Sequence, residues 1–181
     1  VVDSEGNAVS VTYTLNGDFG AYLVPEGTGV VLNNSLPDFD FVVRDGGIGK
    51  ANLIEPGKRP LSSMTPTIVA KNAKAVWIIG NPGGTTIITT NVQIILNLID
   101  FKMNIAEAVA APRIFHGWFP DETLFEKRIT TKDSRKLYES MGHKVTDIQW
   151  TFGPAMCIHI DHDKKLYYGV ADPRSPDGLS A

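Results

Sequence analysis

The apolar positions of residues 85–100 recur at three- and four-residue spacing, as they do along one face of a helix. This spacing predicts a largely buried helix. Just upstream, residues 67–71 and 75–79 are short runs rich in apolar and β-branched side chains, and they flank the polar turn Asn72-Ala73-Lys74. That pattern predicts a β-hairpin that leads into the helix.

The first sixty residues have no helical period. Residues 8–16 alternate small or apolar residues with hydroxyl side chains, and residues 29–32 form a second short apolar run. Both segments predict strands. Residues 37–60 carry glycine, proline and charge in no regular order, which predicts a loop.

The second half begins with two more helix signals. Asn104 and Glu107 have the spacing of a capping box, which predicts a short helix that Pro112 limits. Residues 132–141 predict a surface helix, and Gly142 stands where a helix commonly ends.

The C-terminal third predicts two strands, at residues 155–160 and 166–170, around a polar turn. Strands that come before and after a pair of helices predict an α+β protein, in which helices cover an antiparallel sheet. The pattern by itself predicts no further detail of the fold.

Composition fits one domain spanning residues 1–181, or one subunit of a larger assembly. Hydrophobic residues make up 43% and charged residues 20% of the 181 residues, which argues against disorder. The formal net charge of -3 and the lack of an arginine- or lysine-rich run argue against a nucleic-acid partner. No apolar run is long enough to predict a membrane span.

The chain begins Val-Val-Asp-Ser, which is neither a signal peptide nor a translation start, so we expect a piece of a longer precursor. Any targeting signal would lie in that precursor, and the compartment stays open. The single cysteine, Cys157, lies in an apolar run and is expected to be an inert buried thiol. The four histidines are scattered, and no metal or organic cofactor is expected.

Two short motifs could serve chemistry. Gly83 and Gly84 stand just before the predicted helix, where N–H groups without a neighbouring Cβ could stabilise a developing negative charge. Ser62 and Ser63 lie between two prolines and could present their hydroxyls to a carboxylate. Taken by itself, each motif is more often an ordinary turn. Neither a nucleophile nor its base is evident, so these residues resemble half of an acyl-transfer site.

Several long motifs in one order resemble the small, C-terminal subunit of the γ-glutamyltranspeptidase (glutathione hydrolase) family, and this resemblance runs nearly end to end. The motifs are the run from Gly6 to Asn16, Leu32-Asn33-Asn34 with Asp38-Phe39, the run from Gly57 to Ile68, Pro82-Gly83-Gly84, Ala111-Pro112-Arg113 and Asp172-Pro173-Arg174.

The resemblance implies an N-terminal-nucleophile hydrolase with an αββα sandwich, which a large subunit from the same precursor would complete. Its nucleophile would be a threonine about five residues ahead of Val1, with its own α-amino group as base. The chain as written would therefore be inactive by itself.

The resemblance also implies a role for each remaining site residue. Thr14 would hold the nucleophile, and Gly83 and Gly84 would supply oxyanion N–H groups. On the substrate, Asn16 and Asp38 would bind the α-amino end of a γ-glutamyl group. Its α-carboxylate would be bound by Ser62 and Ser63.

Two departures from the family pattern bear on the substrate. Ser35 stands where the family usually has glutamine or glutamate, and it is shorter, so it contributes less to binding the amine. The loop from Asp38 to Ser62 contains no tyrosine, which predicts an open pocket suited to bulkier groups.

The expected activity is γ-glutamyl transfer and hydrolysis, with glutathione and related γ-glutamyl amides as donors. An amidase for a glutaryl-type acyl group and a non-catalytic family remnant stay open as alternatives. Four aromatic residues are expected in the core or in a subunit contact: Tyr22, Trp77, Trp118 and Trp150.

Overall fold

The computed structural model describes residues 1–126, 131–175 and 178, and it divides into two compact units. The first, here called the core unit, comprises residues 1–12 and 63–181. The second, the loop unit, comprises residues 13–62. Each unit has an order of its own and is described separately. Among the described residues no helix is both long and apolar enough to cross a membrane.

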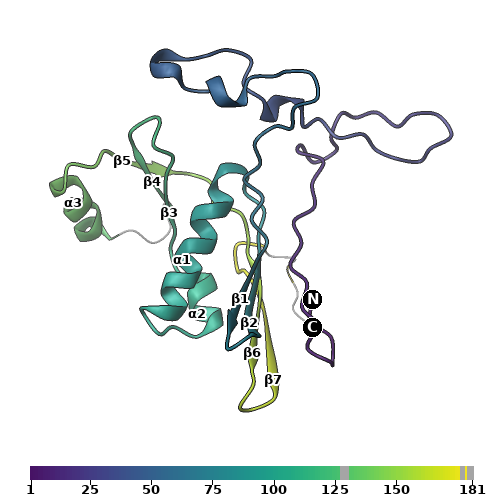
Figure 1. The fold of residues 1–181 in the computed structure, drawn as a ribbon. Coiled ribbons are helices and arrows are strands. Elements are labelled where there is room, and N and C mark those ends of the chain that lie inside the picture. Colours follow the sequence, from purple (N-terminus) through teal and green to yellow (C-terminus); the bar gives the residue numbers. More distant parts are fainter. Residues whose placement is uncertain (127–130, 176–177, 179–181) are drawn as a thin grey trace. The chain divides into compact units, whose positions relative to one another are not determined.

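A four-stranded antiparallel sheet forms the centre of the core unit (Figure 1), with the order β1-β2-β6-β7. The strands are β1 Thr67–Lys71, β2 Lys74–Gly80, β6 Met156–Asp161 and β7 Leu166–Ala171. Both hairpins expected from the sequence are confirmed. In the first, Asn72 and Ala73 adopt positive φ angles of 53° and 60°, the backbone twist that a tight hairpin turn requires.

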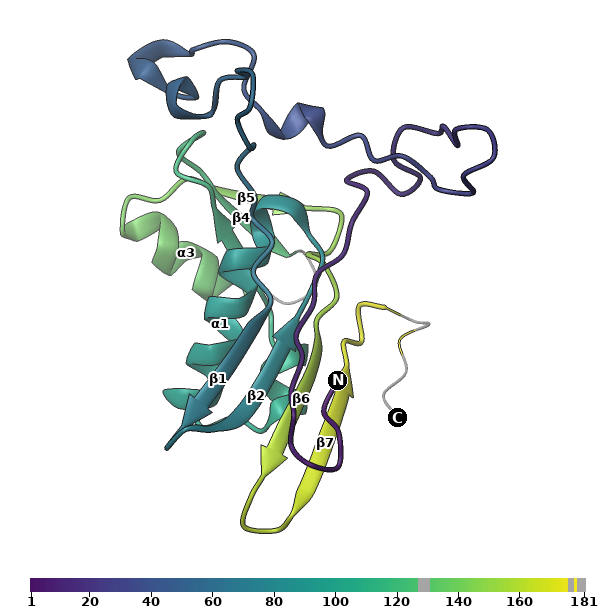
Figure 2. The ribbon, with the colours of Figure 1, turned by 45° about the vertical axis from the view of Figure 1, so that its right-hand side comes forward.

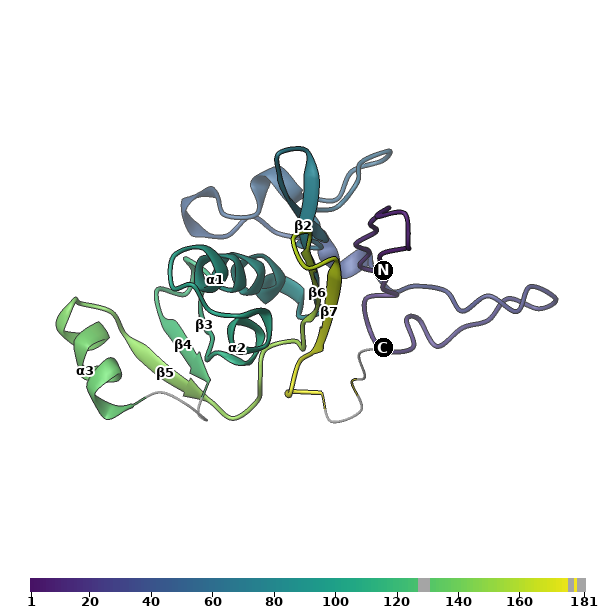
Figure 3. The ribbon, with the colours of Figure 1, turned by 90° about the horizontal axis from the view of Figure 1, so that it is seen from below.

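Two helices cover one face of this sheet, as Figures 1 and 3 show. Helix α1, Ile87–Ile99, follows the short 3-10 turn η4, Gly84–Thr86, and confirms the helix expected from the apolar spacing. Helix α2, Ile105–Ala110, begins at the expected capping box. The buried core between helices and sheet includes Ile79, Ile94, Val109, Ala155 and Cys157.

A second, three-stranded sheet has the order β3-β4-β5, with the strands β3 Ile114–His116, β4 Thr123–Glu126 and β5 Val145–Ile148. Helix α3, Lys132–Ser140, lies in the connection between β4 and β5, which pair in parallel. The helix and its closing Gly142, at φ 93°, are confirmed. The three strands were not expected from the sequence, because runs of three or four residues show too little alternation to stand out.

The N-terminal segment runs over the sheet on the face away from the helices (Figures 2 and 3). It turns back on itself so that Val1 and Val9 exchange two backbone hydrogen bonds of 2.9 Å. Ser10 Oγ then donates to the carbonyl of Ile79 at 2.7 Å. The expected strand at residues 8–16 is wrong, because only the isolated pair Val2–Ala8 forms a bridge and a strand needs a continuous partner.

The loop unit holds three 3-10 turns, η1 Leu36–Asp38, η2 Asp45–Gly47 and η3 Lys50–Asn52. They fall inside the segment expected to be a loop, which is confirmed. The expected strand at residues 29–32 is wrong, because the backbone hydrogen bonds of this segment form no continuous ladder with another segment. Leu32 accepts from Ala21 N–H and donates to the carbonyl of Leu23.

Candidate functional site

The diglycine corner, residues 82–84, joins the end of β2 to the turn before α1. Gly83 has φ 138° and Gly84 has φ 56°, conformations that a residue with a side chain adopts only under strain. Thr86 closes the corner, because both its N–H, at 3.1 Å, and its Oγ1, at 2.9 Å, donate to the carbonyl of Gly83. Within the described part of the chain, the N–H groups of Gly83 and Gly84 donate to no acceptor. Two donors are thus left for a ligand.

Ser63 lies against this corner. Its Oγ donates to the carbonyl of Gly84 at 2.7 Å, so the structure brings together two motifs that lie 21 residues apart. The segment after Ser63 is held to α1 by the buried Asn91, whose Nδ2 donates to Thr65 O and Thr67 Oγ1. The corner and one of the paired serines therefore form a single local structure in the core unit.

The loop unit brings together three other expected site residues. Asn16 donates through its backbone N–H to Thr14 Oγ1 at 2.8 Å and through Nδ2 to Asp38 Oδ1 at 3.1 Å. Asn34 fixes this arrangement, because its Oδ1 accepts from Gly17 N–H and its carbonyl accepts from Asn16 Nδ2. The positive φ of 78° at Asn16 allows its backbone and side chain to donate in different directions. A carboxylate beside an amide and a hydroxyl could bind an ammonium group.

Ser35 and Ser62 belong to the same unit. Ser35 precedes the turn η1, and its carbonyl accepts from Asp38 N–H at 3.0 Å, so its backbone positions Asp38. Ser62 is exposed at the last position of the loop unit. The expected site residues thus form two groups, one in each unit: Thr14, Asn16, Ser35, Asp38 and Ser62, and separately Ser63, Gly83 and Gly84.

The buried residues Arg113, Glu126 and Asp172 form a cluster with Arg174, whose side chain is 5% exposed, and these four residues are here called the charge cluster. Arg113 pairs with Asp172 at 2.6 Å, and Arg174 pairs with Glu126 at 2.6 Å and with Asp172 at 3.0 Å. The arginines also donate to the carbonyls of Val109 and Ala111 at the end of α2. In the sequence both arginines stand out only as parts of motifs, and no local pattern indicates that they pair with Glu126.

The carboxylates of the charge cluster stay ionised. Burial alone would raise the pKa of Asp172, but N–H donors from Ala155 and Arg174 and both arginine charges outweigh it and lower the pKa below its ordinary value. Burial acts in the same direction on Glu126, where the hydrogen bond from Arg174 and the N–H of Phe152 likewise lower the pKa. Two positive and two negative charges therefore balance inside the fold.

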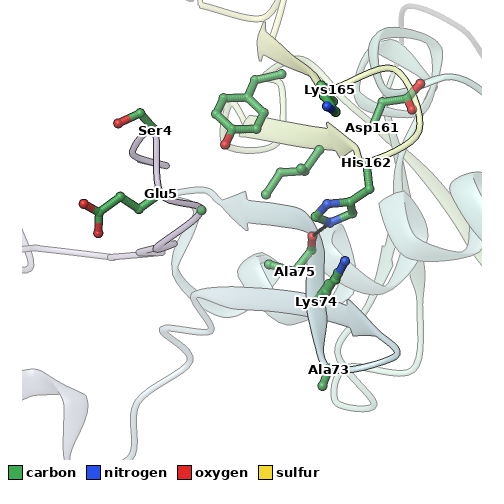
Figure 4. A pocket seen from close by; sticks show the side chains of 11 residues that line it. Ser4, Glu5, Ala73, Lys74, Ala75, Asp161, His162 and Lys165 are labelled. Carbon is green, nitrogen blue, oxygen red and sulfur yellow. Dashed lines mark hydrogen bonds between the residues drawn. The ribbon is translucent and has the colours of Figure 1, made fainter.

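Other candidate groups lie away from the expected site. A cavity of about 680 Å³ opens between the N-terminal turn and the ends of both hairpins (Figure 4), where His162 Nε2 bonds the carbonyl of Ala75 at 2.8 Å. None of the expected site residues lines this cavity. Cys157 is buried, as expected, and burial raises the pKa of its thiol to about 12, so its inertness stays a prediction with a physical cause. Over residues 1–126, 131–175 and 178, no cluster of three or more His, Cys, Asp or Glu could hold a metal.

The aromatic residues differ in their exposure. Trp77 packs against the core between helices and sheet, as expected. The side chains of Tyr22, Trp118 and Trp150 are exposed, so a place in the core of this chain is wrong for them. Contact with another subunit stays a prediction for these three.

The comparison with known families and curated proteins agrees with the geometry. The γ-glutamyltranspeptidase family matches over residues 1–181. The glutathione hydrolase proenzyme of Escherichia coli (strain K12) is 47% identical over 186 residues, which is 100% of this chain and 32% of that protein. The glutathione hydrolase proenzyme of Bacillus subtilis (strain 168) is 41% identical over 172 residues, 95% of this chain and 28% of that protein. The chain spans about a third of the length of such relatives.

Solved structures match over nearly the full length of this chain and of their own chains. An acivicin-inhibited γ-glutamyltranspeptidase chain superposes with a TM-score of 0.88 at 43% identity, covering 96% of each chain. A Helicobacter pylori γ-glutamyltranspeptidase mutant gives a TM-score of 0.88 at 42% identity, covering 97% of each chain. The transpeptidase CapD of Bacillus anthracis, at 22% identity and a TM-score of 0.76, shares the fold. This α+β chain therefore has the fold of the small-subunit half of an N-terminal-nucleophile hydrolase and belongs to the γ-glutamyltranspeptidase family.

Proposed function

We propose that this chain is the small-subunit part of an enzyme that transfers and hydrolyses γ-glutamyl groups, with a threonine upstream of Val1 as nucleophile. The observation that carries the proposal is the contact between Ser63 and the diglycine corner. The hydroxyl of Ser63, which would rotate away from the Gly84 carbonyl to donate to a substrate carboxylate, lies beside two N–H groups that are without an acceptor among the described residues. Such donors stabilise the oxyanion that forms when a nucleophile attacks an amide carbonyl.

The N-terminal hairpin supports the location of the nucleophile. Val1 and Val9 are a hydrogen-bonded pair, so each residue upstream of Val1 would meet one residue further beyond Val9 in an antiparallel register. In that register the fifth residue ahead of Val1 pairs with Thr14. The hydroxyl of Thr14 could then orient a threonine whose free α-amino group removes the proton from its own Oγ.

The hydrogen-bonded group in the loop unit supports an amino-acid head group as the substrate's recognised end. Asp38 is held by Asn16 and offers a carboxylate to an ammonium group. A glutaryl donor lacks this ammonium group, so the carboxylate would favour γ-glutamyl donors. No cofactor is required for the two steps, formation of an acyl ester and its release by water or an amine.

Exposed apolar side chains support a large subunit from the same precursor as the partner. Tyr13, Phe19, Tyr22 and Phe41 are each more than half exposed within a short stretch of the loop unit. Large apolar side chains exposed in one unit are typical of a surface that another chain contacts. The large subunit would bury them and would complete the substrate pocket.

The test uses the full-length precursor and two chromogenic donors, γ-glutamyl-4-nitroanilide and glutaryl-4-nitroanilide. We expect self-cleavage of the precursor and release of nitroaniline mainly from the γ-glutamyl donor. Asp38→Asn should lower kcat/KM for that donor by about a hundredfold, because a charged hydrogen bond to the amine is worth about 2–3 kcal/mol. The same change should leave the glutaryl donor almost unaffected.

Two results would argue against this proposal, and a third would support a role for position 35. Equal turnover of both donors, with no effect of Asp38→Asn, would favour an amidase that does not recognise the amine. Selective gain for the γ-glutamyl donor in Ser35→Gln would support an amine-binding role at that position. A precursor that neither cleaves itself nor turns over either donor would favour a non-catalytic member of the family.

A further inference from the structure

Gly153 packs directly against Pro82 and Gly83 of the diglycine corner. A Cβ added at Gly153 would overlap the carbonyl oxygen of Pro82 and would lie 3.1 Å from the Cα of Gly83. In the opposite direction, a Cβ at Gly83 would lie 3.4 Å from the backbone N of Gly153. Two backbones therefore touch without an intervening side chain, although 70 residues separate them in the sequence.

The segment containing Gly153, residues 152–155, is held by the charge cluster at three points. Arg113 Nη1 donates to the carbonyl of Gly153 at 2.8 Å. On either side, the N–H of Phe152 donates to Glu126 and the N–H of Ala155 donates to Asp172, both at 2.9 Å. All three bonds involve charged side chains, which bind more strongly than neutral groups. This segment, here called the backing segment, is thus a fixed wall.

We infer that Gly153 is a positioning residue for acyl transfer, whose missing side chain lets the backing segment fix the direction of the Gly83 and Gly84 N–H groups. The inference rests on the proposed function. It adds a residue that neither its sequence context nor the family motifs quoted for this chain single out. Gly153 acts through the corner and touches no substrate atom.

The backing segment matters because an oxyanion is stabilised only by donors at 2.7–3.1 Å from its final position. The corner itself is made of two glycines at positive φ, so its own backbone restricts it little. Rigidity has to come from outside the corner. Thr86 holds the carbonyl of Gly83, and Gly153 packs against Pro82 and Gly83.

The experiment compares Gly153→Ala with Gly80→Ala in the full-length enzyme. Gly80 is a matched control, because its added Cβ would meet only ordinary contacts at 3.6 and 3.7 Å, and neither glycine has a positive φ. For Gly153→Ala we expect kcat for the γ-glutamyl donor to fall by about a hundredfold, as a displacement of about 1 Å does, with KM changed less than about threefold. Gly80→Ala should keep wild-type values.

A second measurement separates positioning from simple destabilisation. A boronate analogue of the γ-glutamyl group forms a tetrahedral adduct with the nucleophile and needs the oxyanion donors, whereas free glutamate does not. Gly153→Ala should weaken the boronate by about a hundredfold and leave the inhibition constant of glutamate unchanged. A merely structural role would lower the melting temperature and affect both ligands alike.

The outcomes distinguish this inference from the proposed function. If the wild-type enzyme is active and Gly153→Ala retains its kcat and boronate affinity, the inference is wrong and the proposed function stands. If wild type itself is inactive, the proposed function fails. Should Gly153→Ala not fold, Arg113→Lys replaces it, because lysine keeps the charge but cannot bond Gly153, Val109 and Asp172 together. Unchanged boronate affinity in that variant would again overturn the inference.

Discussion

Removal of the Asp172 carboxylate takes away a buried charge that accepts four hydrogen bonds. Its two oxygens accept from Arg113 Nη2 at 2.6 Å, from Ala155 N–H at 2.9 Å, and from the backbone and side chain of Arg174 at 3.0 Å each. In Asp172→Ala the buried Arg113 keeps its positive charge and loses its partner. Breaking one side of a buried ion pair costs about 3–5 kcal/mol of unfolding free energy.

Urea unfolding of the full-length protein, followed by tryptophan fluorescence, measures this cost. The matched control is Asp147→Ala, which removes an acidic partner of Arg135 from a pair whose side chains are 35% and 42% exposed. Solvent screening limits such a surface pair to about 0–1 kcal/mol. Costs for Asp172→Ala and Asp147→Ala that agree within error would refute the reasoning that burial gives the charge cluster its strength.

The pH dependence of a further variant, Asp172→Asn, tests the cause of this stabilisation. Because the folded-state pKa values of Asp172 and Glu126 lie below the ordinary values of 3.8 and 4.5, their stabilisation is complete above those values. It is lost as the pH falls through the lower folded-state values. The difference in unfolding free energy between wild type and Asp172→Asn should therefore narrow in that acid range. A constant difference across it would contradict the linkage argument.

Three further predictions concern single elements. Asn104→Ala should cost about 1 kcal/mol in thermal unfolding, because the capping box with Glu107 is lost, and an unchanged melting temperature would argue against it. Gly142→Ala should cost about 1–2 kcal/mol in the same assay, since its φ of 93° strains a residue with a Cβ. Cys157 should resist a thiol reagent at pH 8 until the protein is unfolded, because the pKa of its buried thiol is about 12; fast labelling of native protein would refute this.

Elements with a strong local signal could be predicted from the sequence. The apolar spacing of α1, the capping box of α2 and the turn residues between β1 and β2 each act over a few neighbouring residues, so their outcome depends little on distant partners. The two strands predicted in the first forty residues do not form, because a local pattern does not show whether a pairing partner exists. A strand becomes one only when another segment supplies its hydrogen bonds, and residues 8–16 find a single bridge.

For the candidate site, too, the sequence showed local features, and the contacts between distant segments came only from the structure. Residue types that suit the chemistry were visible, with glycines at a helix start and serines between prolines, and the resemblance gave them roles. Their contacts were not visible. The bond from Ser63 to Gly84 and the packing of Gly153 on Pro82 join segments 21 and 71 residues apart, and no local pattern reports such a distance.

The sequence by itself determined the local conformations and the family, because caps, turns and apolar periods act between near neighbours and long motifs are specific. Only the tertiary structure decided which charges meet. Arg113, Glu126 and the pair Asp172 and Arg174 come from three different places in the chain, and each charge would be costly to bury alone. They are stable inside the fold because it brings opposite charges and backbone donors together, and the same chain folding sets Gly153 behind the diglycine corner.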